Sequence, residues 1–166
     1  MIEPVSIVEG WCPGAIGDIA ALHGRHYARD WGFGVYFEAK VARELAGFVS
    51  PLPDQDCGLW LARDGSGRIL GAVALDGREP DGMGRAHLRW FILDDAARGK
   101  GLGARLLDQA VAFGRHRRIS GIYLWTFAGL DAARGLYESR GFTLVEQRSG
   151  DTWGTPVTEQ RFELTF

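Results

Sequence analysis

Apolar residues recur along this chain with two periods, and the periods predict its helices and strands. Apolar positions three to four residues apart, such as Phe37, Val41, Leu45 and Phe48, are typical of an amphipathic helix. This period predicts helices over residues 15–30, 36–48, 101–116 and 131–140. Short alternating or continuous runs of β-favouring residues predict strands over residues 3–10, 59–63, 69–75, 87–93, 122–126, 142–147 and 159–165.

The order of these elements is βααβββαβαββ, which predicts an α/β (α+β) fold with one mixed sheet and helices on both faces. Asp64-Gly65-Ser66-Gly67 predicts a hairpin turn, and the two prolines within residues 50–56 predict a loop. Asp131 is expected to cap the start of the last helix, and Gly141 is expected to end it. A chain of 166 residues has the size of one domain, so residues 1–166 are predicted to form a single domain.

Composition narrows the classes of function. The net charge of −2 gives no field that attracts nucleic acid, and no apolar run approaches the roughly 20 residues that span a bilayer. Four histidines without a C-x-x-C pair do not indicate a zinc site, so no metal is expected. Cys12 and Cys57 are isolated, and residues 1–4 do not begin a signal peptide, so reduced thiols and a cytoplasmic location are expected.

The most informative segment follows the strand at 87–93. It reads Arg98-Gly99-Lys100-Gly101-Leu102-Gly103 and opens the helix over 101–116. Its three glycines leave backbone N–H groups uncovered at a helix N-terminus, where these groups lack intrahelical partners and the helix dipole adds partial positive charge. Arg98 and Lys100 add whole charges. The loop therefore predicts a phosphate or diphosphate site, while a tight turn with solvated charges is the alternative interpretation.

Two other phosphate-binding loops do not fit this segment. A P-loop places Ser or Thr after its lysine, but Gly101 follows Lys100. A dinucleotide loop needs G-x-G-x-x-G and an acidic residue about 20 positions later. Here the spacing is G-x-G-x-G, and the next predicted strand, 122–126, ends without a carboxylate. A nucleotide-binding oxidoreductase is therefore disfavoured.

This order of elements, with R-G-K-G-L-G at 98–103 and L-Y-E-S-R-G-F at 136–142, resembles the GNAT family of N-acetyltransferases. The family's first motif, R/Q-x-x-G-x-G/A, is met by Arg98, Gly101 and Gly103, and its second, a tyrosine shortly before Gly-Phe, by Tyr137 and Gly141-Phe142. A finer resemblance, to the acetyltransferase half of proteins that fuse a MarR-type regulator to a GNAT domain, carries over no DNA binding. It rests on Trp11, His23-Gly24, Tyr27-Ala28, Trp31-Gly32, Leu124-Trp125-Thr126-Phe127 and Trp153-Gly154.

The resemblance implies a mostly antiparallel sheet of about seven strands, in which strand 88–93 diverges from strand 122–126 and opens a slot for acetyl-coenzyme A. In the family, the loop holds the diphosphate and strand backbone holds the pantetheine arm. The cofactor-binding residues implied are Trp90, Phe91, Ile92, Leu93, Arg98, Gly99, Lys100, Gly101, Leu102, Gly103, Ala104, Thr126 and Tyr137. One departure is Leu130, where many members have an asparagine; Thr126 or Asp131 is expected to take over its role.

Tyr137 is the candidate general acid, because a phenol with a pKa near ~10 stays protonated at neutral pH and can give its proton to a departing thiolate. A core aromatic residue on an amphipathic helix is the alternative. The general base stays open between Glu38, His23 and His26, or no base is needed because the amine arrives neutral. His23 is also interpreted as a buried structural histidine, and His26 as exposed. The acceptor pocket is expected to be lined by His23, Tyr36, Glu38, Arg89, Trp125 and Trp153.

The expected function is transfer of the acetyl group of acetyl-coenzyme A to a primary amine of a small molecule or peptide, by direct attack in a ternary complex. The alternative is a non-catalytic acyl-coenzyme A sensor or interaction domain that keeps the loop but has lost turnover. Neither nucleic acid nor membrane is expected as a partner. Homodimerisation is left open, because such folds often dimerise.

Overall fold

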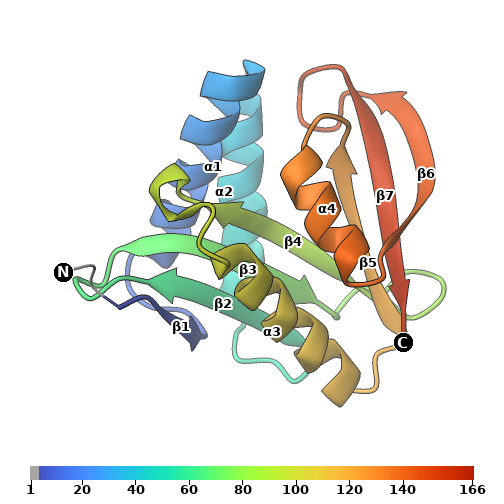
Figure 1. The fold of residues 1–166 in the computed structure, drawn as a ribbon, viewed down its shortest axis with the longest axis horizontal. Coiled ribbons are helices and arrows are strands. Elements are labelled where there is room, and N and C mark those ends of the chain that lie inside the picture. The colour runs from blue at the N-terminus through green and yellow to red at the C-terminus, as the bar shows by residue number, and fades with distance from the viewer. Residues whose placement is uncertain (1–3) are drawn as a thin grey trace.

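One sheet runs through residues 4–166, the part of the chain that this computed structural model describes, and it carries helices on both faces (Figure 1). The elements are β1 (Ser6–Glu9), α1 (Ala15–Trp31), α2 (Val35–Val49), β2 (Cys57–Arg63), β3 (Ile69–Asp76), β4 (Arg85–Leu93), a short 3-10 helix η1 (Asp95–Ala97), α3 (Leu102–His116), β5 (Gly121–Phe127), α4 (Asp131–Ser139), β6 (Thr143–Gly150) and β7 (Val157–Thr165). The predicted order of strands and helices is confirmed. The expected first strand began at residue 3, which lies outside the described residues.

The seven strands of residues 4–166 lie in the order β1-β2-β3-β4-β5-β7-β6. Every neighbouring pair is antiparallel except β4 and β5, which are parallel. This sheet confirms the predicted mixed, mostly antiparallel fold. The single parallel pair lies in the middle, with α3 as its crossover, so the fold has an α-helical connection where parallel pairing requires one.

The parallel pair is short, and this fact determines the position of the site. β4 and β5 are joined at three residue pairs, which end at His87 and Tyr123. Beyond this point the two strands diverge, as Figure 1 shows, and no pairing joins them within the described chain. The edge of β4 from Leu88 to Leu93 therefore keeps backbone N–H and C=O groups that a full ladder would have used. The expected slot between the strands is confirmed.

A β-bulge interrupts β4 beside the slot. Ala72 pairs with Ile92 and Ala74 pairs with Arg89, so one residue of β3 lies opposite two residues of β4. Trp90 is one of these two, and its φ of 48° is in the left-handed region, which is unfavourable for a residue with a bulky side chain. A bulge bends its strand and changes the direction of the side chains that follow. β4 is therefore bent where it lines the slot.

Two cores, one on each face of the sheet, hold the helices in place. α1 and α2 cover one face, and α3 and α4 cover the other. The core between the sheet and α1 and α2 contains the large buried residues Ile19, Phe37, Leu45 and Leu59. The core between the sheet and α3 and α4 contains Leu106, Leu107, Leu124 and Phe162. Burying such side chains contributes about 1.5–3 kcal/mol each. The slot between β4 and β5 connects the two faces through the sheet.

The end of α4 confirms one predicted signal. Gly141 has a φ of 88°, its N–H donates to the Glu138 carbonyl at 3.0 Å, and the N–H of Phe142 donates to the Tyr137 carbonyl at 3.1 Å. This pair of bonds is the Schellman arrangement that closes helices with glycine. It also fixes Phe142 against Tyr137, with ring centroids 5.8 Å apart.

The predicted cap at the start of α4 is wrong. Leu130 occupies the N-cap position, without a side-chain cap, and Asp131 is the first residue of the helix. The chain leaves β5 through Gly129 with a φ of 107°, and after this turn the helix begins one residue earlier than a cap at Asp131 requires. The Asp131 carboxylate still lies in the first turn, where the helix dipole favours negative charge.

The remaining global expectations concern thiols, metals and membranes. Cys12 and Cys57 are both free thiols. Nowhere in residues 4–166 do three histidine, cysteine or acidic side chains gather as metal ligands would. None of the helices in the described part of the chain combines the length and the apolar character that crossing a bilayer requires.

Candidate functional site

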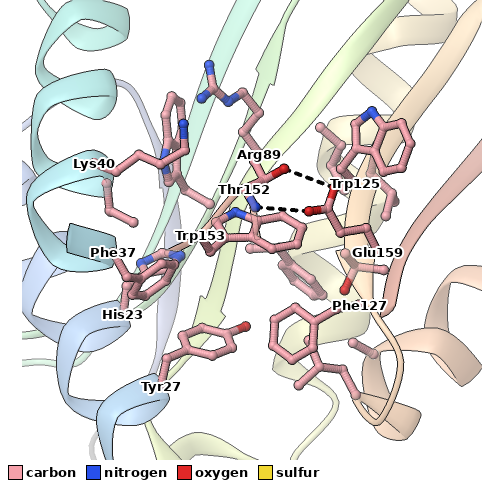
Figure 2. A pocket seen from close by; sticks show the side chains of 18 of the residues that line it. His23, Tyr27, Phe37, Lys40, Arg89, Trp125, Phe127, Thr152, Trp153 and Glu159 are labelled. Atoms are coloured by element: carbon pink, nitrogen blue, oxygen red, sulfur yellow. Dashed lines mark hydrogen bonds between the residues drawn. The ribbon is translucent and has the colours of Figure 1, made fainter. Parts of the chain in front are cut away.

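A cavity of about 370 Å³ lies where β4 and β5 separate, and Figure 2 shows it from close by. Side chains of α1, α2, β4, β5, α4, β6, β7 and the β6–β7 connection line it. The two helix layers lie on opposite faces of the sheet, so the cavity passes through the slot and receives side chains from both. Tyr27 and Phe37 come from one layer and Tyr137 from the other.

The glycine-rich loop presents a continuous row of free amides. From Gly99 to Ala104, six consecutive N–H groups donate no hydrogen bond to any residue in the described part of the chain. Gly99 and Gly101 have φ values of 75° and 74°, and a Cβ at either position would meet no atom within 4 Å. The space in front of these amides is therefore open. A diphosphate fits this geometry, because N–H groups at a helix N-terminus bind anions.

Arg98 lies beside this loop in a cluster of charged groups. One of its guanidinium nitrogens, Nη2, lies 3.3 Å from Nδ1 of His26, and Nε lies 3.3 Å from an Asp95 carboxylate oxygen. Arg29 of α1 also pairs with Asp95. Burial, and after it the charge of Arg98, lowers the pKa of His26. His26 therefore belongs to the loop region and does not line the cavity, and the expectation that it is exposed is wrong, because α1 and the loop leave its side chain mostly buried.

The four residues predicted along β4 divide between the cavity and the cores. Trp90 and Phe91 line the cavity. The Ile92 side chain is buried under α1 and α2, and the Leu93 side chain packs on the side of α3, where a Cβ on Gly103 would lie 3.1 Å from it. Their backbone groups nevertheless lie on the edge that β5 leaves unpaired. Leu102 and Gly103 are buried at the start of α3, and Lys100 is exposed.

Tyr137 combines the two interpretations that the sequence left open. Its ring packs in the core, 6.0 Å from the rings of Phe91 and Phe162, and it also lines the cavity. Its hydroxyl makes no hydrogen bond with any residue from 4 to 166. Burial, with a smaller effect of Tyr27, raises the pKa of Tyr137 well above its usual value. The phenol therefore keeps its proton at every physiological pH.

His23 and Tyr27 enter the cavity from α1 (Figure 2). The His23 Nδ1 lies 2.8 Å from the Ile19 carbonyl oxygen, which can only accept, so Nδ1 carries the proton and Nε2 keeps its lone pair. Burial lowers the pKa of His23 to about 4, so the ring is neutral at pH 7. Burial raises the pKa of Tyr27 to about 12, so this second phenol is also neutral.

Charged residues of α2 and β4 form one wall of the cavity. Lys40 Nζ donates to Glu44 Oε1 at 2.6 Å, and Arg89 Nη2 donates to Glu44 Oε2. The Arg89 guanidinium carbon also lies 4.1 Å from the centroid of the Trp90 ring. One carboxylate is therefore shared by two cations in this wall.

Aromatic and polar residues of β5, β6, β7 and the β6–β7 connection form the opposite wall. The Arg148 guanidinium lies 4.4 Å from the centroid of the Trp125 ring. Glu159 is buried, with a relative exposure of 2%, and accepts from the Thr152 N–H at 3.0 Å and from the Thr152 hydroxyl at 2.9 Å. These bonds hold the segment that carries Trp153, whose ring lies 5.6 Å from that of Phe127. Figure 2 shows the Thr152–Glu159 contacts.

The structure brings four of the six predicted acceptor residues to the cavity: His23, Arg89, Trp125 and Trp153. It does not bring Glu38 or Tyr36 there. Glu38 is exposed and lies over Gly24 of α1, and Tyr36 is 57% exposed and lies over Gly154. Thr126 and Tyr137, predicted on the cofactor side, both line the cavity.

Sequence reasoning missed part of the lining: Tyr27, Lys40, Glu44, Arg148 and Glu159. A signal for two of these was present, because Phe37, Lys40, Val41 and Glu44 recur every three to four residues and share a helix face. Glu159 gave no signal, since a carboxylate at the start of a strand usually faces solvent.

Comparison with known proteins agrees with this geometry. The profile of the Acetyltransferase (GNAT) family matches residues 22–142. N-acetylaspartate synthetase of Xenopus tropicalis is 38% identical over 79 residues, which cover 48% of this chain and 28% of that protein. The chain spans about a third or less of the length of the curated relatives that it matches.

Solved structures share the fold. An acetyltransferase of the GNAT family from Staphylococcus aureus Mu50 superposes with a TM-score of 0.77 at 16% identity, over 98% of this chain and 99% of that chain. A putative acetyltransferase from Salmonella typhimurium, solved with its cofactor acetyl-CoA, superposes with a TM-score of 0.74 at 17% identity, over 96% and 94% of the two chains.

Proposed function

This chain belongs to the acetyltransferase (GNAT) family, and from this premise we propose that it transfers the acetyl group of acetyl-coenzyme A to a primary amine of a small molecule or peptide. The observation that carries the proposal is the continuity of three features. Six free amides at the start of α3 lead to the unpaired edge of β4, and this edge leads to a cavity that contains a protonated phenol.

The residues present fit the co-substrate. The amides of Gly99 to Ala104, with Arg98 and Lys100, bind the diphosphate. The free backbone groups of β4 near Trp90 and Ile92 hydrogen-bond to the amides of the pantetheine arm, which thereby takes the place of a strand. Amides near Phe91 and Ile92, at the end of the bulge, polarise the thioester carbonyl. Thr126 lies on the opposite edge of the slot.

The chemical step places Tyr137 at the leaving group. The neutral amine attacks the thioester carbon, the new N–C bond forms, and the C–S bond breaks with its electron pair on sulfur. The Tyr137 hydroxyl donates its proton to the thiolate and recovers one from solvent, and the attacking nitrogen releases its extra proton to solvent. His23 Nε2 is free to accept a hydrogen bond from the amine. With a pKa of about 4 it is a weak base, so an amine that arrives neutral suits this cavity.

Glu38 is not proposed as the general base, because it lies outside the cavity. The two carboxylates that line the cavity, Glu44 and Glu159, are both paired with cations. No unpaired carboxylate therefore faces the amine among the lining residues of the described chain.

The proposal also includes the expectations from the sequence about domain organisation, location and partners. Residues 1–166 act as one acetyltransferase domain, and the protein works in the cytoplasm without nucleic acid or membrane as a partner. The finer likeness to the acetyltransferase half of MarR–GNAT fusions rests on six short motifs, and four of these, at His23, Tyr27, 124–127 and Trp153, contribute residues to the cavity lining. Homodimerisation stays open.

The test measures the free thiol of coenzyme A with a panel of amines. The name of one relative, N-acetylaspartate synthetase, adds aspartate to this panel. Release of thiol that depends on both acetyl-coenzyme A and an amine is the expected result. A thermal upshift with acetyl-coenzyme A but no thiol release with any amine would support the sensor alternative. An upshift with NADH and none with acetyl-coenzyme A would contradict both.

A further inference from the structure

The fixed charges that line the cavity are unequal in number. Among the described lining residues, Lys40, Arg89 and Arg148 are cations, and Glu44 and Glu159 are carboxylates. His23 and His87 also line the cavity, but burial lowers their pKa values to about 4 and about 3, so they add no charge at pH 7. The cavity therefore carries an excess positive charge when it holds no ligand.

The excess lies on the wall of α2 and β4. Glu44 uses both carboxylate oxygens, one for Lys40 and the other for Arg89, so one negative charge serves two cations. Arg89 donates through Nη2, and its Nε and Nη1 make no hydrogen bond with any residue of 4–166. Lys40 likewise uses one of its three N–H groups. Donors without partners thus remain beside a cavity whose other surfaces are largely aromatic.

On the opposite wall, the one cation and the one carboxylate that line the cavity, Arg148 and Glu159, pair with each other. Glu159 accepts from Arg148 and from both donors of Thr152, and Arg148 also pairs with Glu146 at 3.7 Å. Neither carboxylate of the cavity is left free to bind an ammonium group. A positively charged group elsewhere on the acceptor would therefore find no free carboxylate in the cavity. A negatively charged group would find the free N–H donors of Arg89 and Lys40.

The position of Arg89 relates this charge to the reaction. Arg89 precedes Phe91 by two residues on β4, which is about 6–7 Å along a strand, and the thioester is proposed to lie near Phe91 and Ile92. The Arg89 side chain stacks on the Trp90 ring and so keeps its guanidinium beside the cavity. A group of the acceptor that lies a few ångströms from the attacking nitrogen can therefore reach the Arg89 guanidinium.

Resting on the proposed function, we propose that the acceptor is an amine that also carries an anionic group, a carboxylate, held by the free N–H donors of Arg89 and Lys40. Amino acids and the C-terminal residues of peptides have this chemistry. Arg89 and Lys40 bind the part of the acceptor that does not react, so they are specificity residues. They contribute to acceptor affinity more than to the chemical step.

The test compares amino acids with their α- and side-chain carboxamides, such as aspartate with asparagine, by coenzyme A release. The acid is expected to have a kcat/KM about tenfold or more above that of the carboxamide. Arg89→Gln and, separately, Lys40→Gln should lower kcat/KM for acids about ten- to a hundredfold, mainly through KM, because charge-assisted hydrogen bonds are lost. Carboxamides should change less than about threefold.

The matched control is Arg43→Gln, which removes the same charge from an exposed position of α2 outside the cavity. It should leave both substrate classes unchanged. If carboxamides have the same kcat/KM as the acids, the inference is overturned. It is also overturned if the Arg89 and Lys40 variants lose the same factor in kcat/KM for both classes. Either result leaves the acetyltransferase proposal intact. Absence of thiol release with every amine would overturn the acetyltransferase proposal and this inference with it.

Discussion

His87 and Tyr123 stack with ring centroids 4.5 Å apart and planes 14° apart, at the last residue pair where β4 and β5 are joined. The Arg161 guanidinium lies 4.2 Å from the centroid of the same tyrosine ring. Burial lowers the pKa of His87 to about 3, so the stack consists of a neutral imidazole and a phenol. This contact lies at the apex of the slot, at the point where the two strands separate.

We therefore expect Tyr123→Ala to weaken both the fold and the binding of acetyl-coenzyme A. Loss of a half-buried aromatic stack should lower the free energy of unfolding by about 1–3 kcal/mol. Tyr123→Phe keeps the ring and serves as the control. Urea unfolding and calorimetric binding measure the two effects. Equal affinity for acetyl-coenzyme A in the Ala and Phe variants would show that the stack does not set the slot.

Tyr137→Phe removes one oxygen atom and leaves the core packing of the ring in place. If the phenol protonates the leaving thiolate, kcat should fall about a hundredfold or more. The Kd for acetyl-coenzyme A should stay within about twofold, because the loop and the β4 edge are unchanged. Steady-state kinetics and calorimetry on the same preparation separate the two quantities. Unchanged turnover would leave Tyr137 as a core aromatic residue.

Gly101→Ala tests the amide row of the diphosphate loop. Gly101 has a φ of 74°, where an L-residue costs about 1–2 kcal/mol, and relaxation of that strain would rotate the neighbouring amides. The Kd for acetyl-coenzyme A should rise about tenfold. Gly17→Ala is the control, since Gly17 is exposed within α1 and has space for a Cβ. This change should stabilise the fold by about 0.5–1 kcal/mol without changing affinity.

The buried, neutral His23 predicts a loss of stability in mild acid. Its pKa of about 4 in the folded protein lies below the value of 6.5 expected when the chain unfolds. The unfolded state therefore binds a proton first as pH falls through 6.5, and stability decreases until the pH reaches the folded pKa. Between pH 7.5 and pH 5 this single histidine should cost about 2 kcal/mol.

Urea unfolding of the parent and of His23→Gln at several pH values checks this prediction. Glutamine does not titrate, so the variant should lose less stability than the parent over the same interval. Parallel curves for the two proteins would mean that another group is responsible, such as His26, whose pKa is also lowered by burial.

Periodicity in the sequence predicted the fold well, because each element satisfies its own local rule. The stripe of Phe37, Val41 and Leu45 requires a helix face against a sheet, and α2 begins and ends within a residue or so of its predicted bounds. The Asp131 cap was missed because the turn at Gly129 decides where α4 begins. That turn depends on Trp31, which packs against Gly129 from a distant part of the chain.

The site was harder to predict because it depends on which flank of each element faces the slot. Glu38 and Lys40 lie on opposite flanks of the same apolar stripe, and the sequence does not indicate that Lys40 and Glu44 face β4 while Glu38 lies over α1. Pairing of Glu44 with Arg89, 45 residues away, requires the assembled sheet. The diphosphate loop needed no such information, since its glycines act through local backbone geometry.

The brevity of the β4–β5 pairing has a mechanical consequence. Three residue pairs join a half that contains β1 to β4 to a half that contains β5 to β7, so the sheet has a weak seam through its middle. A ligand that hydrogen-bonds to the free edge of β4 and packs against β5 contacts both halves of the sheet across that seam. We therefore expect bound acetyl-coenzyme A to hold the two halves of the sheet together as well as to react, and we expect the release of coenzyme A to remove this link.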